Sequence, residues 1–184
     1  MFHESSKTTI VMLGNSLTEF GGSWNSRLDR SDVKNCGQSG FITSQILRLL
    51  KTCVLVEQPR ACFVMGGIND LAMGFRVPGI FENHKKIIQE LKAGNIMPVF
   101  QSTLYVHGDP EINRHVTHLN KLLEDFCREN DVHFIDLNAS MSGDNGLLPE
   151  FTFDGIHLTE QGYDGWSREL KMFIKKHSQL FENL

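Results

Sequence analysis

Hydrophobic residues along the chain form short continuous runs that alternate with longer segments in which they recur every three or four positions. The runs have the length of buried strands and lie at residues 7–13, 32–35, 61–65, 96–100 and 132–135. The periodic segments predict amphipathic helices that begin at Thr43, extend from Pro78 to Gly94, and cover 112–126 and 159–177. Strands and helices therefore alternate five times, which predicts an α/β protein.

This alternation favours a mostly parallel five-stranded sheet with helices on both faces, an α/β/α sandwich. Thr43 is expected to be the N-cap of its helix and Gly94 the C-cap of the next one. The segments 17–32 and 138–154 are expected to be loops, the first with a short helix at its start as the alternative. With 184 residues and no internal repeat or linker, we expect a single domain over 1–184.

Composition narrows the class of protein. The net charge of −4 gives no reason to expect a nucleic-acid partner, and no apolar run has the length of a membrane span. The polar N-terminus, residues 1–9, lacks the apolar core of a secretory signal. Four cysteines lie far apart without a C-x-x-C pair, so we expect reduced thiols, neither zinc fingers nor disulfide frameworks, and a cytoplasmic protein. Oligomeric state stays open.

Chemically useful side chains follow the predicted strands. Because parallel strands end at one edge of a sheet, Ser16, Gly40, Asn69, Asp154 and His157 are expected to meet there. A serine hydroxyl becomes a nucleophile when a histidine takes its proton, and that histidine needs an acceptor on its other nitrogen, here Asp154. The backbone amides of Ser16 and Gly40 and the side-chain amide of Asn69 are candidate oxyanion donors. This set predicts acyl transfer.

Four short motifs strengthen this interpretation. They read G-N-S-L-T at 14–18, N-C-G-Q-S-G at 35–40, G-I-N-D at 67–70 and D-G-I-H at 154–157. In this order they resemble the first, second, third and fifth blocks of the GDSL, or SGNH, hydrolases. The resemblance implies a flavodoxin-like three-layer fold, hydrolysis of esters or thioesters, and neither a metal nor an organic cofactor. In that family, the last glycine of the second block lends an amide to the oxyanion hole.

Two positions leave alternatives open. Gly37 competes with Gly40 as the source of the second-block amide. Asn15 stands where the family usually has aspartate, which puts in doubt whether every first-block interaction is kept. Because Asn15 is neither the nucleophile nor the base, we expect activity to survive the difference.

Other candidates have simpler explanations. His115 and His118 are three apart on one predicted helix, but without a third ligand a solvated face explains them better than a metal site. His107 follows a strand end and is a weaker candidate for lining the pocket. Several aromatic residues on loops are candidates for an acyl or leaving-group pocket or for core packing: Phe20, Trp24, Phe41, Tyr105, Phe151 and Phe153.

The expected function is a small cytoplasmic serine esterase that hydrolyses short-acyl esters, with an acetyl group on a sugar or other small carrier as the first choice. A thioesterase or a lysophospholipase-type lipolytic enzyme of the same family is one alternative. The other is a non-enzymatic flavodoxin-like binding module, but the glycine-rich phosphate-binding motifs do not follow the first strand. The expected partner is a small-molecule ester, with no nucleic acid and no membrane.

Overall fold

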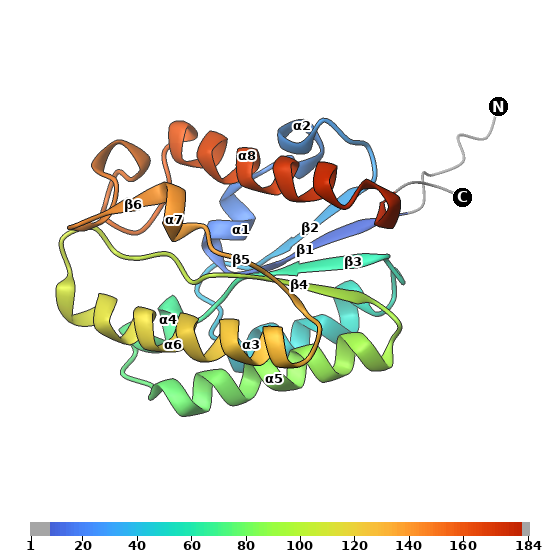
Figure 1. The fold of residues 1–184 in the computed structure, drawn as a ribbon, viewed down its shortest axis with the longest axis horizontal. Helices are drawn as coiled ribbons and strands as arrows, with labels where there is room; N and C mark the ends of the chain where they lie inside the picture. Colours follow the sequence, from blue (N-terminus) through green and yellow to red (C-terminus); the bar gives the residue numbers. More distant parts are fainter. Residues whose placement is uncertain (1–7, 182–184) are drawn as a thin grey trace.

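A five-stranded parallel sheet forms the middle layer of the protein, as described for residues 8–181 by a computed structural model (Figure 1). Its strands lie in the order β2–β1–β3–β4–β5. Their bounds are β1 Ile10–Gly14, β2 Val33–Gly37, β3 Ala61–Val64, β4 Met97–Gln101 and β5 His133–Ile135. The five predicted strands are confirmed, although Lys7, the predicted start of the first, lies outside the described residues.

Helices cover both faces of the sheet, as predicted. In Figure 1, α1, α2, α7 and α8 lie above the sheet and α3 to α6 lie below it. Their bounds are α1 Ser16–Phe20, α2 Trp24–Leu28, α3 Thr43–Leu49, α4 Ile68–Ala72, α5 Val77–Ala93, α6 Pro110–Glu129, α7 Asn138–Met141 and α8 Glu160–Lys176. A π-helical turn, η1 Leu50–Val54, extends α3, and two 3₁₀ turns come later in the chain, η2 Pro149–Phe151 and η3 Ser178–Leu180. None of the described helices is long and apolar enough to cross a membrane.

The sheet is buried on both faces, which explains the continuous apolar runs. Along β1, Ile10 and Met12 pack with Trp166 of α8, whereas Val11 and Leu13 pack toward α3 and α5. All five side chains have no exposed surface. Burying one such side chain contributes roughly 1.5–3 kcal/mol, so the two faces together hold β1 rigidly. The carboxyl end of β1 is therefore a fixed platform for the turn between β1 and α1.

The start of α3 corrects the expectation for Thr43. Ile42 is the N-cap residue, and its backbone N–H is bound by the side chain of Gln45. Thr43 is the first helical residue, fully buried, and its hydroxyl donates to Asp70 Oδ1 at 2.5 Å. The sequence suggested a cap because threonine is a common one, but a buried carboxylate from another segment takes its hydroxyl instead.

Several short elements occupy segments expected to be loops. Residues 17–32 contain α2 as well as the anticipated short helix, and 138–154 contains α7, η2 and a hairpin of β6 Ser142–Gly143 and β7 Gly146–Leu147. The helix α4 begins directly after Gly66 and Gly67, the two glycines that follow β3. Such elements span too few residues to show a helical or strand period in the sequence.

The cysteines also correct an expectation. Cys36 of β2 and Cys53 of η1 form a disulfide, while Cys62 and Cys127 are free and buried. The expectation of four reduced thiols is wrong for this pair, because residues 17 apart in sequence are brought together by the packing of η1 beside the sheet. The cytoplasmic location stays a prediction and loses part of its support, since disulfides are typical of oxidising compartments.

Candidate active site

Ser16 lies at the turn between β1 and α1. Asn15 caps α1, and its Oδ1 accepts a hydrogen bond from the Leu17 N–H at 3.0 Å. The turn is tight, because a Cβ on Gly14 would lie 2.2 Å from Thr18 Oγ1. This local geometry makes Ser16 the first residue of α1, where backbone N–H groups have no partner inside the helix. Asn15, which stands where the family usually has aspartate, therefore still caps α1 through its side-chain oxygen.

The structure brings together the serine, the histidine and the aspartate predicted from the sequence. Ser16 Oγ lies 3.1 Å from His157 Nε2, and His157 Nδ1 lies 2.6 Å from Asp154 Oδ2. The other carboxylate oxygen of Asp154 accepts from the backbone N–H of Ile156 at 2.9 Å and of His157 at 2.7 Å. One oxygen therefore shapes the turn and the other orients the ring. The three side chains form a continuous hydrogen-bonded relay.

Asp154 is held as a carboxylate. Burial opposes its ionisation, but the hydrogen bonds from the His157 ring and from the two backbone N–H groups outweigh it, so the pKa of Asp154 lies below its usual value. The side chains of His157 and Asp154 are 28% and 42% exposed, whereas Ser16 is 7% exposed. The relay thus runs from a nearly buried hydroxyl to a carboxylate in contact with solvent.

Two aromatic rings flank the histidine. The ring of Phe20 lies 5.5 Å from that of His157, and the ring of Phe153 lies 6.0 Å away in a stacked arrangement. Both phenylalanines are more than half exposed, at 52% and 70%. Exposed apolar rings beside a polar relay offer contact area to a ligand. Of the six loop aromatics suggested by the sequence, these two contact the site, whereas Trp24 is buried in the core against Trp166.

The structure distinguishes Gly37 from Gly40. The backbone N–H of Gly37 donates to Asn35 Oδ1 at 2.9 Å, and a Cβ on Gly37 would lie 2.1 Å from the Glu19 nitrogen. Gly37 is therefore committed to packing against α1. Gly40 has a φ of +75°, is exposed, and donates its N–H to no group within residues 8–181. Its free N–H is the one available to a ligand.

Asn69 lies in the first turn of α4, and one of its side-chain N–H groups donates to the Phe41 carbonyl at 2.9 Å. The neighbouring Asp70 accepts from the backbone N–H and the hydroxyl of Thr43. Burial raises the pKa of Asp70, and the bonds from Thr43 oppose that rise. Two adjacent residues of α4 thus tie down the segment 41–43, which directly follows Gly40. Asp70 was not among the residues predicted from the sequence, although its place in the G-I-N-D motif was the available signal.

The remaining candidates lie elsewhere. His107 Nδ1 is 2.7 Å from the Leu147 carbonyl, so its ring is engaged with β7. His115 and His118 line a hollow beside Phe75 and Arg76. In the described part of the chain, no group of three or more histidine, cysteine, aspartate or glutamate side chains is placed to hold a metal ion.

A serine, histidine and aspartate joined by hydrogen bonds at the carboxyl edge of a parallel α/β/α sandwich is the arrangement of serine hydrolases. The family is identified by comparison of the sequence with family models: the model of the GDSL-like lipase/acylhydrolase family matches residues 12–164. The chain belongs to this family. The resemblance noted in the four motifs is thereby confirmed.

Two solved structures of other proteins have a fold similar to that of this chain. A GDSL-like lipase from Bacteroides thetaiotaomicron has a TM-score of 0.85 and 24% identity, covering 93% of this chain and 89% of that one. An acetylxylan esterase from Geobacillus stearothermophilus has a TM-score of 0.78 and 16% identity, with 94% of each chain covered. At these identities the likeness is one of fold.

A relative found by sequence comparison is named for a different activity. An N-acylneuraminate cytidylyltransferase of Streptococcus agalactiae is 28% identical over 141 residues, which make up 76% of this chain and 34% of that protein. The chain therefore spans about a third of the length of this relative.

Proposed function

We propose that this chain is a serine esterase of the GDSL-like family in which Ser16 is the nucleophile. The observation that carries the proposal is the continuous relay from Ser16 Oγ through His157 to Asp154, with heavy-atom distances of 3.1 and 2.6 Å. Both lie within the range expected of a nucleophile and its base, and of a base and its orienting carboxylate. Membership of an acylhydrolase family supports the same chemistry.

In the proposed reaction, Ser16 Oγ forms a bond to the ester carbonyl carbon while its proton passes to His157 Nε2. The carboxylate of Asp154 stabilises the resulting imidazolium and keeps the ring in place. The tetrahedral intermediate then expels the alcohol, which takes the proton from His157. A water molecule, deprotonated by the same nitrogen, attacks the acyl carbon; the bond to Ser16 Oγ then breaks, His157 returns the proton to Oγ, and the acid is released.

Three donors are proposed to stabilise the oxyanion: the N–H of Ser16, the N–H of Gly40 and the second side-chain N–H of Asn69. The position of Ser16 at the start of α1, where helix N–H groups are unpaired, supports its role as a donor. Gly40 supports it by its unused N–H. One donor of this kind typically contributes a factor of ~10²–10³ to kcat.

The proposed substrate is a short-acyl ester, in the first instance an acetyl ester, on a sugar-like carrier. The partial exposure of the relay supports a bulky carrier presented from outside. The fold also occurs in an acetylxylan esterase, and the curated relatives are named for N-acylneuraminate, so both names refer to sugars. A thioesterase or lysophospholipase-type activity predicts longer acyl chains, and a profile of hydrolysis rate against acyl length separates the two.

The test combines a chromogenic acetate ester with a fluorophosphonate probe. The native protein should hydrolyse the ester and be labelled, whereas Ser16→Ala should lose about 10⁴-fold or more of its turnover and all labelling. Ser178→Ala, which removes an exposed serine near the C-terminus, is the matched control and should keep both. A Ser16→Ala variant with even a tenth of native activity would refute the nucleophile. An inactive, unlabelled native protein would favour the non-enzymatic binding module.

A further inference from the structure

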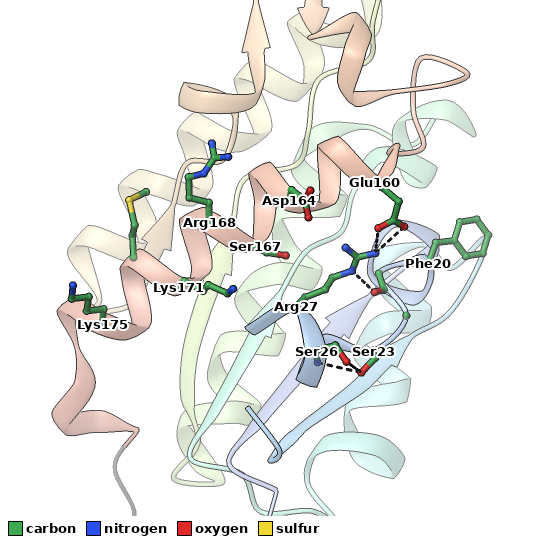
Figure 2. Close-up of a pocket in the computed structure, with 13 residues that line it drawn as sticks. Phe20, Ser23, Ser26, Arg27, Glu160, Asp164, Ser167, Arg168, Lys171 and Lys175 are labelled. Carbon is green, nitrogen blue, oxygen red and sulfur yellow. Dashed lines mark hydrogen bonds and ion pairs between the residues drawn. The ribbon is translucent and has the colours of Figure 1, made fainter. Parts of the chain in front are cut away.

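A groove of about 940 Å³ runs between α2 and α8 (Figure 2). It begins at Phe20, whose ring lies 5.5 Å from that of His157, and it continues along α8 as far as Lys175. Glu160, at the start of α8, is three residues beyond His157, so the near end of the groove adjoins the relay. The groove therefore leads from the candidate active site along the outer side of the molecule.

The wall near the relay is fixed by Arg27. Its guanidinium binds both oxygens of Glu160 at 3.1 Å, its Nε donates to the Gly21 carbonyl at 2.5 Å, and it lies 4.5 Å from the centre of the Tyr163 ring. These contacts join the turn between α1 and α2 to α8. Because Arg27 is already engaged on each side, the wall is formed before any ligand arrives, which lowers the cost of binding.

The far half of the groove carries positive charge. Arg168, Lys171 and Lys175 follow one another along α8 (Figure 2). Lys171 is paired with Asp29 at 2.5 Å, but Arg168 and Lys175 have no ion-pair partner in the described chain. Basic residues commonly complement the dipole in the last turn of a helix, yet Arg168 lies at the middle of α8, outside that turn. The helix dipole therefore does not explain why an arginine unpaired among residues 8–181 occupies this position, and the protein as a whole is acidic, with a net charge of −4.

Hydroxyl groups also line the groove, together with the carboxylate of Asp164. Ser23 and Ser26 of the α2 segment face the groove, and Ser167 lies on the side of α8. Ser167 is 5% exposed, and its Oγ has no hydrogen-bond partner among residues 8–181. In Figure 2 its hydroxyl points from α8 into the space beside Arg27. A buried hydroxyl without a partner is costly, and a bound polar group would satisfy it.

We propose that this groove binds an anionic oligosaccharide, the carrier part of the ester substrate; this inference rests on the proposed function. The serine hydroxyls and Phe20 suit sugar hydroxyls and a sugar face, and Arg168 and Lys175 suit a carboxylate or phosphate. Arg168 lies eight residues beyond Glu160 along α8, about 12 Å by the rise of a helix. A free acetate ester cannot span that distance, whereas an oligosaccharide can.

The first experiment measures binding alone, by calorimetric titration. The ligands are trigalacturonate for the carboxylate, maltotriose phosphate for the phosphate, and neutral maltotriose. The native protein should bind at least one charged ligand more tightly than maltotriose, and the tighter one identifies the anion. The double variant R168E/K175E should raise the Kd of that ligand by about tenfold or more, because charge-assisted contacts become repulsive.

The control is K51E/K86E, which makes the same change in net charge at two exposed lysines lining a separate hollow between η1 and α5. It should bind the charged ligand as the native protein does. Equal binding of charged and neutral ligands, equal binding by native protein and R168E/K175E, or equal weakening by K51E/K86E would overturn the proposal.

The second experiment links the groove to turnover. The ratio of kcat/KM for acetylated trigalacturonate to that for acetylated maltotriose should fall about tenfold in R168E/K175E and stay constant in K51E/K86E. An unchanged ratio in R168E/K175E would overturn the role as a substrate subsite even where the chromogenic acetate is hydrolysed. Charge-dependent binding by a protein that hydrolyses no ester would leave the anion site standing and refute the proposed esterase.

Discussion

The side-chain amide of Asn69 has one engaged N–H group and one that can bind a ligand. One N–H donates to the Phe41 carbonyl at 2.9 Å, and an amide has a second N–H for a ligand. If that second N–H binds the oxyanion, Asn69→Ala should lower kcat by ~10²–10³ and change KM much less, because the interaction forms in the transition state. Initial-rate kinetics on the chromogenic acetate measure both parameters.

Thermal unfolding of the same variant separates catalysis from folding. Alanine also removes the bond to Phe41, which costs roughly 0.5–1.5 kcal/mol in stability. Asn69→Asp keeps the size of the side chain but has no N–H to donate, so it should be as slow as Asn69→Ala. A folded Asn69→Ala variant with native kcat would show that the amide only ties down the segment 41–43.

Single residues of the relay were predictable because each follows a strand or lies in a short motif. Ser16, His157 and Asp154 were identified by type and position, and the structure places them within hydrogen-bond distance. The choice between Gly37 and Gly40 was not predictable. Gly37 ends β2 and Gly40 follows three residues later, and they are separated by the bond from the Gly37 N–H to the Asn35 side chain and by the packing of Gly37 against α1.

At the scale of elements, the contact between α4 and α3 depends on Asp70. Its carboxylate is 2% exposed and accepts from the Thr43 N–H and hydroxyl. In Asp70→Asn, one acceptor becomes an N–H₂ group facing those donors. We expect a loss of about 1–3 kcal/mol in the free energy of unfolding, together with a lower kcat, since the segment next to Gly40 loses its anchor. Urea denaturation and ester kinetics measure the two effects.

The control is Asp125→Asn on α6, where an exposed carboxylate pairs with Lys121 and Arg128. Exposed pairs contribute about 0–1 kcal/mol, so this variant should remain close to native in stability and rate. If Asp70→Asn proves equally mild, Asp70 is not the anchor of α3.

The long helices were predictable, whereas the short helices α2, α4 and α7 were not. The helix α6 covers 20 residues, enough turns for its apolar period to stand out, whereas α4 has five. The N-cap of α3 was misplaced at Thr43 because the carboxylate that takes its hydroxyl is 27 positions away. Local sequence identifies a good cap but does not reveal a distant competitor.

For the whole molecule, the disulfide between Cys36 and Cys53 predicts that reducing agents lower the free energy of unfolding. Four reduced cysteines would predict no such effect. A cross-link over 17 positions restricts the unfolded chain and typically contributes 2–4 kcal/mol. Urea denaturation with and without a reductant should show a loss of this size. The double variant C36A/C53A should match the reduced native protein and ignore the reductant. Native protein whose midpoint is the same in both conditions would contradict the cross-link.

His84 predicts how stability depends on pH. It is 1% exposed beneath Phe100, and burial lowers its pKa to about 4 although a bond to the Gly66 backbone opposes this. An unfolded histidine has a pKa of about 6.5, so between these values the unfolded chain binds a proton that the folded chain does not. Stability should therefore fall by about 3 kcal/mol as the pH drops from 6.5 to 4.

The measurement for His84 is the free energy of unfolding in urea at several pH values. His84→Leu cannot take up the proton, so its stability should decline less steeply over the same range. Only the difference in slope between the two proteins belongs to His84, because other groups titrate in both. Parallel slopes would show that His84 is protonated equally in the folded and unfolded chains.

The layered architecture was predictable because strands buried on both faces form uninterrupted apolar runs in the sequence. Ile10 to Leu13 is such a run, and its side chains alternate between the two faces of the sheet. The pairing of Cys36 with Cys53 was not predictable, because spacing along the chain carries no information on distance in space. The same limit hid the groove between α2 and α8, whose two walls are more than 130 positions apart at Arg27 and Glu160.

The hydrogen bond between Ser16 and His157 joins residues 141 positions apart. A ribosome making this chain completes the serine turn long before the histidine turn. Until the segment leading into α8 has emerged and docked, a nascent chain holds a hydroxyl without a base. If Ser16 is the nucleophile, fragments that end before His157 should be inert toward esters and toward serine-directed probes. Labelling of Ser16 would then count only those chains that contain His157 and have folded.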